Sequence, residues 1–245
     1  MKLNHIFSFF VLLSCLTSCS KMYKIEGESS VTGLDGKQLY LRAFQNGCWT
    51  DVDSAEVVHG FFSMKGPADS VRMASLYLDD ICLMPLVLEE GHIKVDINNL
   101  EFTAKGTPLN DALYDFIGRR NRIELQLEDV ERKEAGLILQ GIDAQRAHQE
   151  AEDERYSLLR EMDNCVKTFI ASNYENVLGP GVFVMIYSDA PYPMLTDQMN
   201  SIVEEAPTAF RNDALLKDFL KKAEENMRLI EEYHSETHIA VISHE

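Results

Sequence analysis

The spacing of apolar residues changes at Thr107, and this change divides the chain into two kinds of structure. Before it, apolar and polar residues alternate in short runs separated by turn residues such as those of segment 32–37. Alternation with period two is typical of half-buried strands. Eight such runs at near-regular spacing predict an antiparallel β-sandwich or a small barrel. The runs cover residues 24–27, 38–44, 50–57, 60–65, 71–78, 83–88, 92–98 and 101–105.

After Thr107 the apolar residues recur every three or four positions, which indicates helices. Thr107 has the character of an N-cap residue, and Pro108 suits the first helical position. Further helices are expected over about 143–172, from a Thr196 cap to about 205, and in a final segment. The predicted fold class is therefore β + α, with an N-terminal antiparallel β-sandwich over residues 19–107 followed by an α-helical region over residues 108–245.

An apolar run over residues 6–16 lies close to the N-terminus and is too short to span a bilayer. It is typical of a cleaved export signal. Two segments after its start resemble the bacterial lipobox, Leu12-Leu13-Ser14-Cys15 and Leu16-Thr17-Ser18-Cys19, and the second matches better. We expect a lipoprotein signal peptide over residues 1–18, cleavage after Ser18 and lipidation of Cys19. The alternative is an ordinary secretory peptide that contains two cysteines.

The residues after Cys19 favour one location over others. Ser20 occupies the position where an aspartate would resemble the inner-membrane retention signal, so the outer membrane is favoured. Residues 21–24 lack the acidic run associated with surface-exposed lipoproteins, which favours an anchor that faces the periplasm. The expected partners are the membrane, through its lipid anchor, and another envelope protein.

The charge balance excludes one class of function. The chain has 40 acidic and 23 basic residues and a formal net charge of −17. A chain this acidic repels phosphate backbones, so nucleic-acid binding is excluded.

An ordered set of short motifs in the strand half resembles a known family. The set runs from Tyr23-Lys24-Ile25-Glu26-Gly27 and Gly36-Lys37-Gln38-Leu39-Tyr40-Leu41, through Val52-Asp53-Ser54-Ala55, to Leu88-Glu89-Glu90-Gly91 and Lys105-Gly106-Thr107-Pro108-Leu109-Asn110. It resembles the domain of unknown function 4369, found at the N-terminus of Bacteroidetes lipoproteins related to thiol:disulfide interchange proteins. The resemblance covers about residues 22–118.

The chain departs from that family in its expected redox chemistry. In the relatives, a thioredoxin-like domain with a C-x-x-C pair follows the helices. This sequence contains no C-x-x-C, and thiol–disulfide catalysis needs an attacking and a resolving cysteine close together. The resemblance therefore implies no catalytic residue here, and we expect neither an enzyme nor a cofactor.

Three cysteines besides Cys19 lie outside the signal segment. Cys48 and Cys82 form a possible disulfide in the oxidising periplasm, or remain two unpaired thiols. Cys165 lies on a helical apolar stripe, where core packing is expected.

Other chemistry finds little support in the sequence. His234 and His238 are spaced i, i+4, which would suit a metal, but exposed polar neighbours favour a frayed helix end, so no metal site is expected. A single tryptophan, Trp49, and few clustered aromatic residues argue against a carbohydrate-stacking platform.

The sequence thus predicts a lipid-anchored, non-catalytic binding or scaffold module. An open sheet edge could accept an extended strand from another protein. The alternative is an accessory to thiol–disulfide exchange that docks a separate thioredoxin-like protein.

Overall fold

The computed structural model describes residues 21–45, 47–188 and 193–242, except for the side chains of residue 231 and residues 234–242. The predicted signal peptide, its cleavage site after Ser18 and the lipidation site Cys19 lie outside the described residues. The side chains of His234 and His238 do so as well.

Within the described residues, eight strands form two four-stranded sheets. Sheet A has the order β4-β1-β7-β8, and sheet B has the order β3-β2-β5-β6. The strands are β1 (Met22–Ser29), β2 (Gln38–Gln45), β3 (Cys48–Glu56), β4 (Phe61–Pro67), β5 (Arg72–Leu78), β6 (Ile81–Leu88), β7 (Gly91–Ile97) and β8 (Phe102–Lys105), and a short 3₁₀ turn, η1 (Thr32–Leu34), precedes β2. Strands followed by helices confirm the predicted β + α class.

The antiparallel prediction is wrong for one pair of strands. β1 and β7 run parallel, with Ile25 opposite Ile93, whereas every other pair of neighbouring strands is antiparallel. Alternation places side chains on the two faces of a strand but carries no information about strand direction. The chain leaves sheet A after β1, returns as β4 on one side of β1, leaves again for β5 and β6 of sheet B, and returns as β7 on the other side of β1.

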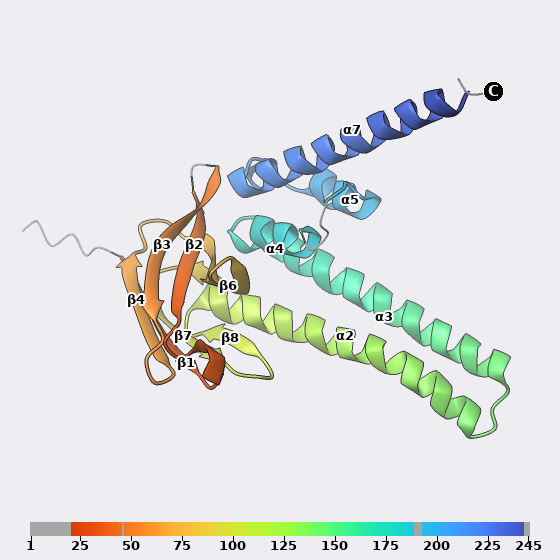
Figure 1. Ribbon diagram of the computed structural model, residues 1–245, viewed down its shortest axis with the longest axis horizontal. Helices are drawn as coiled ribbons and strands as arrows, with labels where there is room; N and C mark the ends of the chain where they lie inside the picture. The colour runs from red at the N-terminus through yellow and green to blue at the C-terminus, as the bar shows by residue number, and fades with distance from the viewer. Residues whose placement is uncertain (1–20, 46, 189–192, 243–245) are drawn as a thin grey trace, which may run out of the picture.

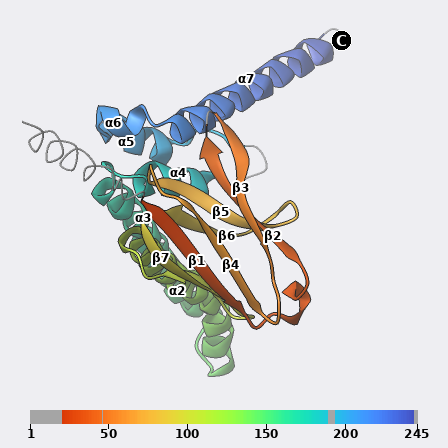
Figure 2. The same cartoon turned by 90° about the vertical axis from the view of Figure 1, so that its left-hand side faces the viewer.

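The core of the strand half lies between the two sheets (Figures 1 and 2). Ile25 of β1, Leu41 of β2, Leu76 of β5 and Ile93 of β7 are fully buried there. Ile25, Leu41 and Ile93 belong to the inward-facing sets of alternating strands, so their burial follows from the period-two pattern. Leu76 lies on β5, where residues 73–76 are all buried.

The helical half consists of α2 (Pro108–Leu139), α3 (Ala144–Ser172), α4 (Leu178–Tyr187), α5 (Asp197–Glu205), α6 (Thr208–Arg211) and α7 (Ala214–Ile242). Figure 1 shows α2 and α3 as an antiparallel hairpin that projects away from the sheets; we call this hairpin the arm. The arm has a small core of its own, made by Ile123, Val130, Ala151 and Leu158. Near the sheets, Phe116 stacks on Phe169 with ring centroids 4.4 Å apart. Among the described residues, none of these helices combines the length and apolarity needed to cross a membrane.

The joint between the two halves is a buried polar cluster at the start of α2. Asn110 is fully buried, and its side chain bonds both backbone groups of Val87 on β6: the Val87 N–H donates to Oδ1 at 2.9 Å and Nδ2 donates to the Val87 carbonyl at 2.8 Å. Tyr114, one helical turn later, donates its hydroxyl to the carbonyl of Pro85 at 2.8 Å. The first turns of α2 therefore cover the edge of sheet B that β6 would otherwise expose.

The capping of α2 differs in detail from the sequence prediction. Thr107 takes the N-cap position with extended backbone angles, and Pro108 follows, but the Thr107 side chain makes no capping bond. Its hydroxyl accepts from Asn110 Nδ2 at 2.8 Å instead. The cap comes from Glu89, whose carboxylate accepts the backbone N–H groups of Leu109 at 2.8 Å and Asn110 at 3.2 Å. A negative charge at a helix N-terminus is favourable, and here it also joins the β6–β7 turn to the helix.

Candidate binding surface

The outer face of sheet B gathers aromatic side chains around one arginine. Tyr40, Arg42 and Phe44 alternate with the buried residues of β2 and therefore point away from the core. The strand register sets Trp49 of β3 opposite Phe44, and Tyr77 of β5 opposite Tyr40. We call these five residues the aromatic face.

Arg42 lies at the centre of the aromatic face. Its guanidinium carbon is 4.5 Å from the ring centroid of Tyr77 and 6.0 Å from that of Tyr40. Arg42 Nε donates to Asp51 Oδ1 at 2.8 Å, and Nη1 lies 3.5 Å from Asp80 Oδ1. The hydrogen bond with Asp51 raises the pKa of Arg42 above its ordinary value. The guanidinium is thus a fixed cation held over tyrosine rings, and two carboxylates balance its charge.

Trp49 provides the most prominent apolar group of the aromatic face. Its side chain is 43% exposed, and its ring meets that of Phe44 edge-on, with centroids 5.9 Å apart and an interplanar angle of 71°. An aromatic side chain held by a neighbour and still open to solvent loses little conformational entropy on binding. Residues of this type frequently dominate the energy of protein interfaces.

An exposed sheet edge lies beside Trp49. The second half of β3 lies close to β4, where the backbone N–H of Lys65 donates to Asp53 Oδ2 at 3.1 Å. In the first half of β3, the edge segment, residues 48–52, has exposed side chains at Cys48, Trp49 and Asp51. The segment ends at Val52, where the β2–β3 register shifts: Arg42 pairs with Asp51 and Leu41 pairs with Asp53, so Val52 has no partner on β2. The edge segment is therefore short and bounded, as natural open edges usually are.

The structure does not bring Cys48 and Cys82 together. Both are exposed free thiols, on β3 and β6, which are the two outer strands of sheet B. Two strands lie between them, so the thiols are separated by roughly 14 Å across the sheet alone. A disulfide needs its Cα atoms within about 7 Å, so the possible bond between them is not formed. Cys165 is half-buried and packs against the small core of the arm.

Cys82 borders the aromatic face. Burial raises the pKa of Tyr77, and the neighbouring Cys82 thiol adds to the rise. The same thiol contributes to the raised pKa of Tyr114, whose main cause is burial. Within the part of the chain that the structure describes, no group of three or more histidine, cysteine, aspartate or glutamate side chains is placed to hold a metal ion.

Sequence reasoning missed the aromatic face. The alternation Tyr40-Leu41-Arg42-Ala43-Phe44 does place three of its members on one side of β2. The register that adds Trp49 and Tyr77 depends on pairing with two other strands.

Comparison with known proteins places the strand half in a family. Residues 23–113 match a family model described as "Domain of unknown function (DUF4369)". No curated protein matches the chain. The match extends from β1 into the first turns of α2, so it includes Glu89, Thr107 and Asn110 of the joint. The segment formed by residues 23–113 thus belongs to the DUF4369 family, a domain whose function is unknown.

Proposed function

We propose that this protein is a lipid-anchored lipoprotein of the outer membrane that faces the periplasm and acts as a non-catalytic binding module. Its anchor is Cys19, freed by cleavage after Ser18, as the lipobox resemblance implies. Its binding site is the aromatic face together with the edge segment of β3. The observation that carries the proposal is the exposed Trp49, which is held against Phe44 beside an exposed edge of the same sheet.

The partner in this proposal is an extended segment of another envelope protein. Such a segment would lie along residues 48–52, where it gains backbone hydrogen bonds from the edge, and would place an apolar side chain against Trp49. Arg42 is already neutralised by Asp51 and Asp80, so the surface does not select a strongly charged partner. Short backbone pairing and one aromatic anchor give a transient contact rather than a permanent assembly.

Peptide binding tests the proposed site. An array of extended peptides from envelope proteins is probed with the protein and with Trp49→Ala, and Phe61→Ala is the matched control. Phe61 is a 59% exposed aromatic residue at the start of β4 in sheet A. Binding that falls at least tenfold in Trp49→Ala and persists in Phe61→Ala supports the proposal. Equal losses in both variants, or no bound peptide at all, would reject it.

The lipid anchor is tested separately. Cells that express the whole chain are fed an alkyne-tagged fatty acid, and the purified protein is analysed by mass spectrometry. We expect label on a mature chain that begins at Cys19 and none in Cys19→Ser. An unlabelled chain cut at another site would show an ordinary secretory peptide instead.

A second candidate function is supported by Cys82. This exposed free thiol lies beside Tyr77, at the border of the aromatic face. A separately encoded thioredoxin-like protein that docks there would make the protein an accessory to thiol–disulfide exchange. Binding of a thioredoxin-like protein that is lost in Cys82→Ser and kept in Cys48→Ser would favour this function over the first.

A further inference from the structure

A second surface, away from the sheets, has the features of a docking groove. It lies between α2 and α3, has a volume of about 960 Å³, and is distinct from the aromatic face. On α3 it extends from Glu161 to Asn173, a length of about 18 Å at the helical rise of about 1.5 Å per residue. Its floor is apolar, because Ile123 and Phe169 are buried there and Cys165 is half-buried. Leu125, 59% exposed, adds an apolar side chain on the α2 side.

The α2 side of the groove also carries two arginines. Arg119 and Arg122 lie one helical turn apart, both are exposed, and neither forms an ion pair with a described residue. Arg120, on the same turn but outside this groove, does pair with Glu124 at 2.8 Å. In a chain with 40 acidic and 23 basic residues, these two arginines on one side of the groove form a local excess of positive charge.

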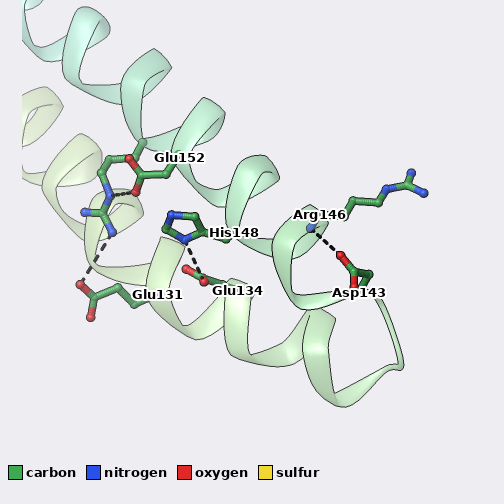
Figure 3. A network of polar contacts seen from close by, with 7 residues as sticks. Glu131, Glu134, Asp143, Arg146, His148 and Glu152 are labelled. Carbon is green, nitrogen blue, oxygen red and sulfur yellow. Dashed lines mark hydrogen bonds and ion pairs between the residues drawn. The ribbon is translucent and has the colours of Figure 1, made fainter.

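The far end of the arm shows the opposite arrangement. There Arg155 reaches Glu131 at 3.7 Å and Glu152 at 3.2 Å, and His148 Nδ1 lies 3.2 Å from Glu134 Oε1 (Figure 3). Those charges are balanced within the chain. At the groove, by contrast, Glu161 is the one carboxylate among the described lining residues, and no ion pair joins it to either arginine.

The shape of the groove favours a helix over a small molecule. Exposed residues line both sides, including Gln126 on α2 and Asn164 and Thr168 on α3, so a small ligand would stay largely in water. Two packed helices leave a groove that accepts a third helix when the floor is apolar and the sides are polar. The groove length matches about 12 residues of such a helix.

We infer that the groove binds an acidic amphipathic helix of a partner protein. Carboxylates three or four residues apart on that helix would face Arg119 and Arg122, which are themselves spaced i, i+3. Guanidinium–carboxylate pairs are charge-assisted and frequently bidentate, so they fix the register of the incoming helix. Apolar side chains on the same face would pack against Leu125 and the groove floor.

The test uses the mature protein and a fluorescent helical peptide of about 18 residues with one glutamate- and leucine-bearing face. The double variant Arg119→Glu/Arg122→Glu reverses the charge of the groove. The matched control is Arg160→Glu on α3, an exposed arginine that does not line the groove. We expect affinity to fall at least tenfold in the double variant and to stay unchanged in the control. A peptide with lysine in place of glutamate should bind the double variant better than the native protein.

Cysteine reactivity provides a second readout at the same site. Bound peptide should slow alkylation of Cys165 in the groove and leave alkylation of Cys82 on sheet B unchanged. Equal peptide affinity for the native protein and the double variant, or no protection of Cys165, would overturn the inference. So would a dimer of the protein that the double variant dissociates, because the occupant would then be a second copy. Since Trp49→Ala leaves this groove intact, failure here is distinguishable from failure of the proposed sheet site.

Discussion

Removing the side chain of Asn110 should damage the joint between the two halves more than its size suggests. In Asn110→Ala, the backbone N–H and C=O of Val87 both lose the partner that the asparagine amide provides. Val87 is fully buried, so water cannot replace that partner without local opening. Each unsatisfied buried group costs about 1–3 kcal/mol, and alanine returns only about 0.5 kcal/mol of helix propensity. The expected loss in the free energy of unfolding is therefore about 2–5 kcal/mol.

Denaturant unfolding followed by circular dichroism measures this loss, with two controls. Asn121→Ala changes an exposed asparagine of the same helix and should change the free energy by less than about 1 kcal/mol. Glu89→Gln keeps an oxygen that can accept the N–H groups of Leu109 and Asn110, so its loss should be about 1 kcal/mol or less. If the free energies of unfolding of Asn110→Ala and Asn121→Ala differ by less than about 1 kcal/mol, the joint does not depend on these hydrogen bonds and the reasoning fails.

Three further outcomes follow from the fold. Gly27→Ala should lower the free energy of unfolding by about 1–3 kcal/mol, because a Cβ at this position would overlap the buried Phe62 ring. In the double variant with Phe62→Ala, the two losses measured by denaturant unfolding should not add. Burial raises the pKa of Tyr23 to about 12 from its ordinary 10, so the unfolded state loses this proton first and stability should fall between about pH 10 and 12. Tyr23→Phe should flatten that part of the stability curve, and an unchanged slope would contradict the assignment. In the native protein Cys48 should react with a thiol reagent much faster than Cys165, because the first thiol is exposed and the second is half-buried; equal rates in a stopped-flow assay would contradict this placement.

The period of the apolar residues located the strands and the long helices α2, α3 and α7, but it did not show how the strands pair. Eight strands and the start of α2 at Pro108 follow from local patterns, because alternation and helical spacing are properties of neighbouring residues. The parallel pairing of β1 with β7 joins segments that lie far apart in the chain. No local pattern contains that information, so the expected antiparallel sandwich proved wrong at this one pair of strands.

The capping of α2 also depends on a contact that local sequence patterns do not contain. The sequence places Thr107 at the N-cap, and it does occupy that position, yet Glu89 supplies the capping oxygen. Eighteen positions separate these two residues in the chain, and only the fold of β7 and β8 between them brings the carboxylate to the helix. The two short motifs that contain these residues therefore meet at the start of α2.

The candidate surfaces depended most on tertiary structure. By itself, the sequence determined the acidic balance, the division at Thr107 and the side of β2 that carries Tyr40 and Arg42, whereas the export signal and its Cys19 anchor stay predictions. Tertiary structure decided that Trp49 joins that side, that Cys48 and Cys82 stay apart, and that Arg119 lies beside an apolar groove. The physical reason is that charge and periodicity are carried by neighbouring residues, whereas a surface is made by residues that register and helix packing bring together from distant parts of the chain.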